Sequence, residues 1–289
     1  MWKEQNIYMK VDRNVDLYSQ NTMRLHSIAD TVYYPESTND LMEVLGQNKT
    51  DCLILAAGSN VILPERLHRP VISLMSLNES LEVLDDGRAH VGCSVRVQKL
   101  IRFLQDNGLG GIEYLYSVPA SLGGLVYMNG GRGKKYNMSI ADYLDEVEYL
   151  DLDDMTAKTM RVRRADFTYR HSPFQDMNAI ILSAFFRFKA QDANDTEALI
   201  KERLAFSKQY LSADKPSCGS VYKKGNKLIF RLLKGMRAGG AMFSRKTANW
   251  ISNMGDATSE DVCRLIRRGQ TLHRLFFCQC EPEVKIVKE

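Results

Sequence analysis

The chain lacks several patterns that would each point to a particular class of protein. None of its apolar runs reaches the roughly 18 to 20 residues that cross a bilayer, and its polar first residues do not form a signal peptide. The six cysteines include no CxxC pair, so we expect reduced cytosolic thiols and no metal site. The net charge of +4 comes without a clustered basic stripe, so neither nucleic acid nor a membrane is an expected partner.

The sequence does contain alternating strand and helix patterns, followed by a distinct C-terminal segment. No GxGxxG follows the first predicted strand, which argues against a Rossmann dinucleotide site. Polar DKPS breaks the chain after a helix that we expect to be capped by Asn194, with Glu197 completing a capping box, and this suggests a boundary near Leu211. Strands are predicted at residues 31–37, 51–57, 146–153, 178–190 and 281–289, and helices at 37–48, 95–111, 194–209 and 258–269.

Two loops of small residues are candidates for holding a phosphorylated ligand. Gly58, Ser59 and Asn60 close a short apolar strand, and such a turn exposes consecutive backbone N–H groups with little steric cover. Residues 117–131, SVPASLGGLVYMNGG, combine a proline-fixed corner with the pair Gly123-Gly124. A glycine pair inside a packed region indicates that the backbone comes close to a ligand or to another strand. From the residues alone, a cofactor site and a tight structural turn both stay open.

An arginine, a serine and two glutamates are candidate catalytic or ligand-binding residues. Arg170 precedes a Ser-Pro turn, where a guanidinium can hold a carboxylate through two hydrogen bonds; a surface ion pair is the alternative. Glu281 and Glu283 share one face of the predicted C-terminal strand, either as catalytic acids or as solvated charges. Ser220, in KPSCGSVYKKG, has no base beside it in the sequence, and the local pattern does not decide between nucleophile, helix cap, turn residue and a rarer role.

Taken in order, these segments resemble one enzyme family. The chain carries GSN after a strand, a proline–small–GG loop leading to Met128-Asn129, YR-x-S-x-F, PSxGSV-aromatic-K, RxGGA…S…AN…IxN and a terminal EPEVK. These motifs are similar, in order and spacing, to those of the UDP-N-acetylenolpyruvoylglucosamine reductases, from about Asn21 to the C-terminus. The short connection between Arg170 and Ser220 resembles the compact second type of that family.

The resemblance implies an α+β fold: a two-subdomain FAD-binding fold of the vanillyl-alcohol-oxidase/PCMH type, plus a smaller α/β substrate-binding domain. We therefore expect FAD-binding subdomains over residues 1–68 and 69–210, the substrate-binding domain over 211–279, and a C-terminal strand over 280–289 that carries a catalytic glutamate. FAD would be bound non-covalently. The implied flavin-binding residues are Ala57, Gly58, Ser59, Asn60, Ser117, Pro119, Ala120, Ser121, Gly123 and Gly124.

The resemblance also implies a reaction. In the family, NADPH reduces the flavin and leaves; UDP-N-acetylglucosamine enolpyruvate then takes a hydride from flavin N5 and becomes UDP-N-acetylmuramate, a peptidoglycan precursor. Arg170 and Glu283 match the residues that stabilise charge on the substrate carboxylate, a role in which one lost donor typically costs roughly 2.7 to 4 kcal/mol. Ser220 matches the proton donor. Tyr169, Lys223 and Lys285 match substrate-binding positions, with the lysines suited to the diphosphate.

The chain departs from the family pattern at several places. Ala56 and Ala120 replace usual glycines near the expected flavin, Lys224-Gly225 replaces a usual Asn-Pro, and Thr247 replaces a usual histidine. Two alternatives to the reductase therefore stay open: a flavoprotein of the same fold that acts on a different sugar or enol, and a binding module without cofactor. Retention of Arg170, Ser220 and Glu283 argues against the second. The sequence does not determine the oligomeric state, although it favours a monomer.

Overall fold

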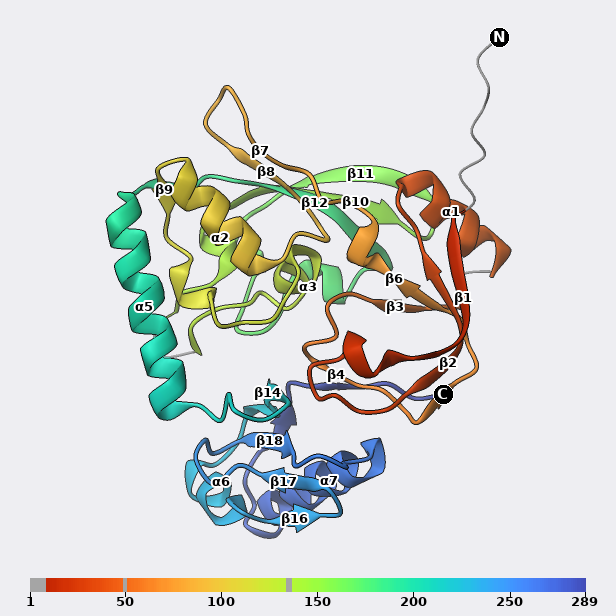
Figure 1. The fold of residues 1–289 in the computed structure, drawn as a ribbon, viewed down its shortest axis with the longest axis vertical. Coiled ribbons are helices and arrows are strands. Elements are labelled where there is room, and N and C mark those ends of the chain that lie inside the picture. Colours follow the sequence, from red (N-terminus) through yellow and green to blue (C-terminus); the bar gives the residue numbers. More distant parts are fainter. Residues whose placement is uncertain (1–8, 49–50, 134–136) are drawn as a thin grey trace.

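The computed structural model of the chain describes residues 9–48, 51–133 and 137–289. The first part is a mixed sheet in the order β1-β2-β6-β3, with β5 also paired to β2 (Figure 1). Its edge strand β1 is antiparallel to β2, whereas β3, β5 and β6 run parallel to their neighbours. The strands are β1 (Lys10–Asp16), β2 (Ile28–Tyr34), β3 (Leu53–Leu55), β5 (Arg66–Leu67) and β6 (Val71–Ser73).

Helix α1 (Thr38–Gln47) covers this sheet and confirms the helix predicted at residues 37–48. Ser37 caps it, accepting from the backbone N–H of Asp40 while the Asp40 carboxylate bonds back to the cap. The apolar stripe of the helix, Leu41, Val44 and Leu45, is buried in a core shared with Ile72.

An antiparallel sheet in the order β11-β10-β12-β8-β7 forms the second part. Its inner face and helix α2 (Val97–Asp106) contribute to one hydrophobic core, in which Val91, Val147, Phe186, Leu100 and Leu104 are buried. Helices α3 (Leu122–Tyr127) and α5 (Ala193–Tyr210) complete this part, together with the short pair β9 (Leu109–Gly110) and β13 (Lys189–Ala190). The five strands are β7 (Leu81–Val83), β8 (Ala89–Gly92), β10 (Leu144–Asp151), β11 (Thr156–Arg161) and β12 (Ala179–Phe186).

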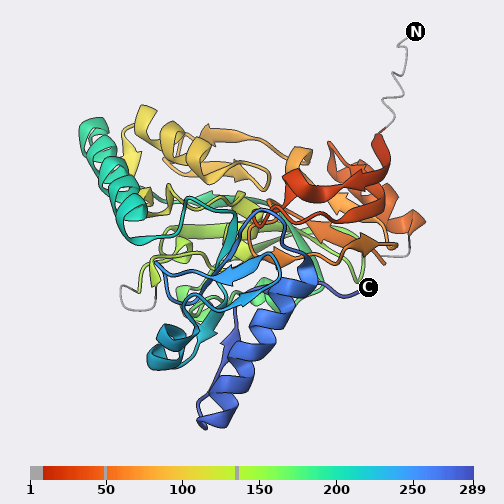
Figure 2. The same cartoon turned by 60° about the horizontal axis from the view of Figure 1, so that its bottom comes forward.

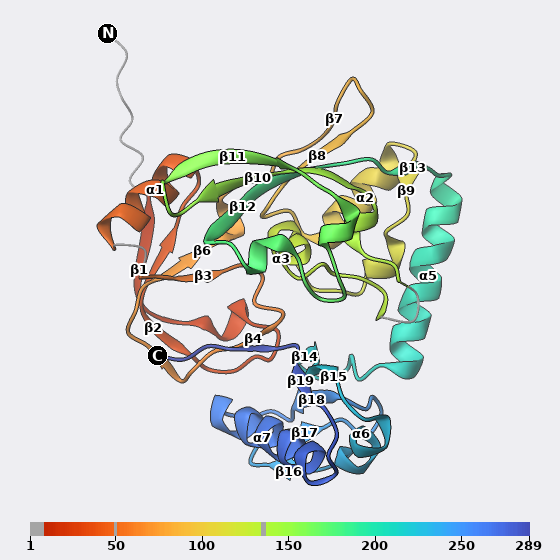
Figure 3. The ribbon, with the colours of Figure 1, turned by 180° about the vertical axis from the view of Figure 1, so that it is seen from behind.

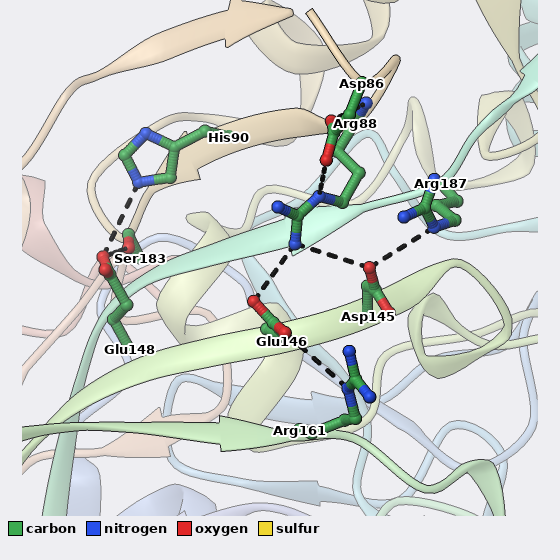
Figure 4. Close-up of polar contacts among 9 residues, drawn as sticks. All are labelled: Asp86, Arg88, His90, Asp145, Glu146, Glu148, Arg161, Ser183 and Arg187. Carbon is green, nitrogen blue, oxygen red and sulfur yellow. Dashed lines mark hydrogen bonds and ion pairs between the residues drawn. The ribbon is translucent and has the colours of Figure 1, made fainter. Parts of the chain in front are cut away.

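The outer face of this sheet carries charged side chains that alternate with the buried ones. Arg88 lies 3.1 Å from Glu146 and 3.5 Å from Asp145, and Arg161 and Arg187 approach the same two acids (Figure 4). Such partly exposed pairs are each worth about 0 to 1 kcal/mol, so they add little to stability.

The C-terminal part is a smaller sheet, β14-β18-β17-β16, backed by helices α6 (Lys227–Leu233) and α7 (Ser259–Leu275) (Figure 2). Thr258 caps α7 as predicted and forms a capping box with Asp261. Residues from the first part, Met23, Leu25 and Ile62, are buried in its core, which fixes the small sheet against the rest of the molecule. The strands are β14 (Ser217–Ser220), β16 (Arg237–Ala238), β17 (Ala241–Phe243) and β18 (Trp250–Asn253).

The C-terminal segment joins two parts of the molecule. The strand predicted over residues 281–289 is in fact two short strands, because the chain changes partner between them. β19 (Glu281–Pro282) pairs with β15 (Tyr222–Lys224) of the C-terminal part, and β20 (Lys285–Ile286) pairs with β4 (Val61–Ile62) of the first part (Figure 3). Glu283 lies at the crossing between them.

Helix α5 corrects another expectation. It begins at Ala193, and its N-cap is Asp192, whose side chain accepts from the N–H of Asn194 at 2.8 Å. The Glu197 carboxylate, predicted to close a capping box, instead pairs with Arg102 at 2.6 Å. Asp192 caps the helix instead of Asn194 because its carboxylate reaches the free N–H groups of the first turn. Within the described ranges, none of the helices is long and apolar enough to cross a membrane.

Close packing of α7 on β15 generates a first prediction. A Cβ atom added at Gly269 would lie 2.3 Å from Tyr222 Oη, whose hydroxyl donates to the Ile266 carbonyl at 2.6 Å. Gly269→Ala should therefore lower the free energy of unfolding by about 1 to 3 kcal/mol, the usual cost of overpacking. Gly46→Ala in α1 is the control: nothing lies within 4 Å of its added Cβ, so a gain of up to about 1 kcal/mol is expected. Chemical denaturation of both variants measures this, and a stabilised Gly269→Ala would contradict it.

Candidate active site

An ion pair between Glu283 and Arg170 forms the centre of the candidate site. Arg170 Nε lies 2.6 Å from Glu283 Oε1, and the two side chains are only 18% and 10% exposed. Burial raises the pKa of Glu283, and the Arg170 cation partly opposes that rise. The second oxygen, Oε2, is buried and has no hydrogen-bond partner among the described residues. A carboxyl group with one engaged and one unengaged oxygen can hold a proton and offer it to an incoming acceptor.

Arg170 reaches Glu283 from a tight turn in which its own backbone is strained. Its φ is 60°, a left-handed value that costs a non-glycine residue of order 1 kcal/mol or more. Paired backbone hydrogen bonds between Thr168 and His171 close the turn, and Gln175 donates to the Arg170 carbonyl at 3.1 Å. The guanidinium also lies 5.3 Å from the ring centroid of Tyr169. The surroundings thus hold an unfavourable conformation that aims the cation at Glu283.

The backbone directly after Ser220 is hydrogen-bonded to Glu283. It ends β14 opposite Trp250, directly after Gly219, whose φ is 76°. The carbonyl of the following residue, Val221, accepts from the N–H of Glu283 at 2.8 Å. The structure therefore places the residue after Ser220 against Glu283, which is itself paired with Arg170. No described residue is hydrogen-bonded to the Ser220 hydroxyl, so the base that a serine nucleophile needs is missing from the part of the chain that the structure shows.

The three predicted substrate residues lie around this centre. Tyr169 stacks on Arg170, while Lys285 is exposed on β20. Lys223 on β15 pairs with Glu281 at 2.7 Å, and this cation lowers the pKa of the Glu281 carboxyl. Glu281 and Glu283, expected on one face of a continuous strand, are therefore in different environments, because the strand ends between them. Glu281 is a solvated partner of a lysine.

The predicted flavin turn is held mainly by protein contacts. Gly58 has a φ of 63°, and a Cβ there would lie 2.0 Å from the Gln20 carbonyl oxygen. Close approach of the backbone at residues 20–21 therefore explains this glycine. Ala57 is buried, and the Ser59 carbonyl accepts from the Thr22 hydroxyl at 3.4 Å. Asn60 donates from its side chain to the carbonyl of Glu283 at 3.1 Å, a contact that no local pattern indicated.

The second predicted flavin loop packs largely into its own part of the fold. The N–H of Gly123 donates to the Cys93 carbonyl at 2.9 Å, and Ser117 accepts from Arg203 at 2.8 Å. Ala120 and Ser121 are buried, whereas Pro119 is exposed. Gly124 is different: its ideal Cβ would lie 3.7 Å from the Cβ of Ala56, in ordinary contact. The two loops therefore meet at Gly124 and Ala56.

The cavity beside Arg170 fits a bound flavin because it contains an acceptor that is unpartnered in the described structure. The cavity has a volume of about 370 Å³. Asn129, which lines it and is 3% exposed, has a buried side-chain oxygen without a hydrogen-bond partner among the described residues. A buried acceptor is expected to have a donor, and a ligand N–H group would provide one. The lining residues are Asn129, Gly131, Gly133, Asn137, Met138, Ser139, Arg164, Phe167, Thr168, Tyr169 and Arg170.

Asn249 is a further residue whose role sequence reasoning missed. Its side chain accepts from the N–H of Tyr222 at 3.0 Å and donates to the Tyr222 carbonyl at 2.8 Å. These are the two hydrogen bonds that the backbone of a paired strand would make. The Asn249 φ of 68° is a value that asparagine tolerates better than most residues. It fixes the segment that follows Ser220. Across residues 9–48, 51–133 and 137–289, no group of three or more His, Cys, Asp or Glu side chains could hold a metal ion.

Comparisons with known proteins match two separate parts of the chain. A family model described as an FAD binding domain matches residues 29–159, and one described as the C-terminal domain of UDP-N-acetylenolpyruvoylglucosamine reductase matches residues 210–287. The reductase of Caldicellulosiruptor bescii is 31% identical, over 93% of this chain and 88% of its own. That of Pediococcus pentosaceus is 33% identical, over 90% and 89%. The crystal structure of UDP-N-acetylenolpyruvylglucosamine reductase from Thermus caldophilus matches the fold with a TM-score of 0.78 at 24% identity, covering 97% of this chain and 100% of that one.

The environment of Glu283 predicts how stability depends on pH. Between the ordinary glutamate pKa of about 4.3 and the raised pKa in the folded protein, the folded state binds more protons than the unfolded state. The free energy of unfolding of the wild type should therefore fall with rising pH across this window, relative to Glu283→Gln, which cannot titrate. The stabilisation is complete below the unfolded pKa and is lost as the pH rises through the folded pKa.

Arg170→Met tests the cause of this shift. Because Arg170 lowers the pKa of Glu283, its removal should extend the falling limb to higher pH. Denaturant unfolding of the wild type, Glu283→Gln, Arg170→Met and the double variant over a pH series measures both effects. A difference between wild type and Glu283→Gln that is flat or rises with pH would contradict the buried, raised carboxyl.

Proposed function

We propose, because this chain belongs to the UDP-N-acetylenolpyruvoylglucosamine reductase family, that Arg170, Ser220 and Glu283 perform the chemistry of that enzyme. The protein reduces UDP-N-acetylglucosamine enolpyruvate to UDP-N-acetylmuramate with FAD and NADPH, a step of peptidoglycan precursor synthesis. The observation that supports the assignment of residues is the buried contact of Glu283 with Arg170, next to a backbone hydrogen bond from Glu283 to Val221, the residue after Ser220.

The seam between the two small-residue loops is where we place the cofactor. When bound, FAD supplies hydride transfer from NADPH to the methylene carbon of the enolpyruvyl group. The turn at Ala57, Gly58, Ser59 and Asn60 would lie along the diphosphate through its backbone. The loop containing Ser117, Pro119, Ala120, Ser121, Gly123 and Gly124 would lie on the other side. A Cβ built on Gly124 would lie 3.7 Å from the Cβ of Ala56, an ordinary van der Waals distance, so the alanine at this departure from the family pattern does not clash with the second loop.

Arg170 and Glu283 would stabilise the charge that develops on the substrate. Hydride addition to the enolpyruvyl double bond pushes negative charge into its carboxylate. Arg170 is permanently charged and held in place, and the unengaged Oε2 of a protonated Glu283 would donate to a carboxylate oxygen. Donors fixed in a buried site do not have to reorganise during the reaction, which is why they lower its barrier.

Ser220 would complete the reaction by giving a proton to the carbon next to the carboxylate. A serine hydroxyl is a weak acid, so this transfer depends on Arg170 and Glu283 first stabilising an enediolate-like form that is ready to accept it. General acid catalysis of this kind typically contributes 10²- to 10⁴-fold. Tyr169, Lys223 and Lys285 would bind the sugar nucleotide, and Lys223 would exchange Glu281 for a phosphate.

The enzyme's role is tested by two absorbance steps under anaerobic conditions. NADPH should bleach the flavin of the purified protein, and addition of UDP-N-acetylglucosamine enolpyruvate should restore the yellow colour rapidly. Bleaching without return would favour a flavoprotein of the same fold that acts on another sugar or enol. A protein that cannot be loaded with FAD would contradict the whole assignment.

Ser220→Ala separates the two half-reactions. We expect flavin reduction by NADPH to stay nearly intact and reoxidation by substrate to slow by about 10²- to 10⁴-fold, because only the second half-reaction needs the proton. The control is Ser252→Ala on the paired strand β18, since the Ser252 hydroxyl is buried without a partner in the described structure. Stopped-flow absorbance measures both steps, and equal losses in both would refute the proton-donor role.

Other expectations from the sequence stay predictions. They are the cytosolic location, the monomeric state, the absence of nucleic-acid and membrane partners, and the boundaries at residues 68, 210 and 279. The partners that the family implies are small molecules: NADPH and the sugar nucleotide.

A further inference from the structure

Asn60 makes contacts that tie the first part of the fold to Glu283. Its side-chain nitrogen donates to the Glu283 carbonyl at 3.1 Å and to the sulfur of Met128 at 3.5 Å. Its own carbonyl accepts from the N–H of Lys285 at 3.0 Å. Two consecutive peptide units of the C-terminal segment are therefore held by one residue.

These contacts leave the Asn60 side chain unsuited to a phosphate. The Glu283 carbonyl can only accept, which fixes the amide nitrogen as the atom that faces it. Both hydrogens of that nitrogen are directed to Glu283 and Met128. The amide oxygen that remains is an acceptor. The oxygens of a diphosphate are acceptors too, so the two cannot form a hydrogen bond. The side chain therefore serves the protein rather than a diphosphate, although its backbone N–H belongs to the turn that we assign to the cofactor.

We propose that Asn60 is a positioning residue that fixes Glu283 for the proton-dependent half of the reaction. The inference rests on the proposed role of Glu283. The Glu283 N–H is held by the Val221 carbonyl at 2.8 Å, and its carbonyl is held by Asn60, so both sides of the residue are bound. Only the side-chain torsions then remain to be set, and the ion pair with Arg170 sets them.

The position of Glu283 needs such support because it lies where the chain has no regular strand. β19 ends at Pro282 and β20 begins at Lys285, so no continuous ladder restrains the residues between them. A displacement of about 1 Å at a reacting group can cost 10²-fold in rate. Flavin reduction by NADPH does not use Glu283 and should not respond.

The test is a double-mutant cycle of Asn60→Ala and Glu283→Gln on the FAD-loaded protein. Asn60→Ala should slow flavin reoxidation by substrate about 10- to 100-fold through its limiting rate, with little change in the substrate concentration at half-saturation. Rates are compared per bound flavin, and the loss in reoxidation should exceed any change in reduction by NADPH by at least about 10-fold. In the Glu283→Gln background the same change should cost less than about 3-fold, because residues that act through one another are not additive.

Each outcome of the cycle decides the inference. Equal losses from Asn60→Ala in both backgrounds would overturn the positioning role while leaving Glu283 catalytic. A Glu283→Gln variant with unchanged reoxidation would overturn the proposed function and this inference with it. If Asn60→Ala loses FAD or fails to fold, Asn60→Asp replaces it in the cycle, since it keeps the shape and removes the donor. Asn107→Ala at the C-cap of α2 is the control, because the Asn107 side chain also donates to a backbone carbonyl, that of Phe103 at 2.8 Å.

Discussion

The buried ion pair between Arg170 and Glu283 is the constraint around which this molecule is arranged. Removing a carboxylate from water costs several kcal/mol, and a nearby arginine offsets part of that cost. Arg170 reaches Glu283 from a strained turn, and Glu283 lies in a segment that has just left one sheet for another. Neither arrangement has a local reason. Each is explained if the meeting point of the three parts is where the substrate carboxylate has to be held.

Environment, rather than residue type, separates the two C-terminal glutamates. Glu281 is exposed beside Lys223, which lowers the pKa of its carboxyl, whereas burial raises the pKa of Glu283 against the pull of Arg170. Carboxyls two residues apart thus have opposite tendencies to hold a proton, which is how acid and base roles are divided in active sites. The change of strand partner between them produces this difference, and Asn60 and Val221 hold it in place.

Much of the architecture could be predicted from local patterns, and the contacts within the site could not. The apolar stripe at residues 37–48 and the Thr258 cap are local signals, and both predictions were confirmed. Motif order led to the family. In contrast, the contact of Glu283 with Arg170, the contact of Asn60 with Glu283, and the close approach of Gln20 to Gly58 join segments far apart in the sequence. No helical or strand periodicity contains that information. The Asn194 cap was wrong because two neighbouring polar residues competed for one role, and only the helix start decides between them.

Two of the departures from the family pattern, Ala56 and Thr247, are accommodated by the structure. Even a Cβ built on Gly124 would lie at an ordinary contact distance from the Cβ of Ala56, so the methyl group of Ala56 does not clash with the other loop. The Thr247 hydroxyl accepts from the N–H of Ser212 and donates to the Tyr210 carbonyl, which makes it a support for the chain that enters the C-terminal part. Neither change touches the contacts among Arg170, Glu283, Val221 and Asn60. A protein that had abandoned this chemistry would have no reason to keep a costly buried carboxylate and a strained arginine, while the surrounding loops were free to vary.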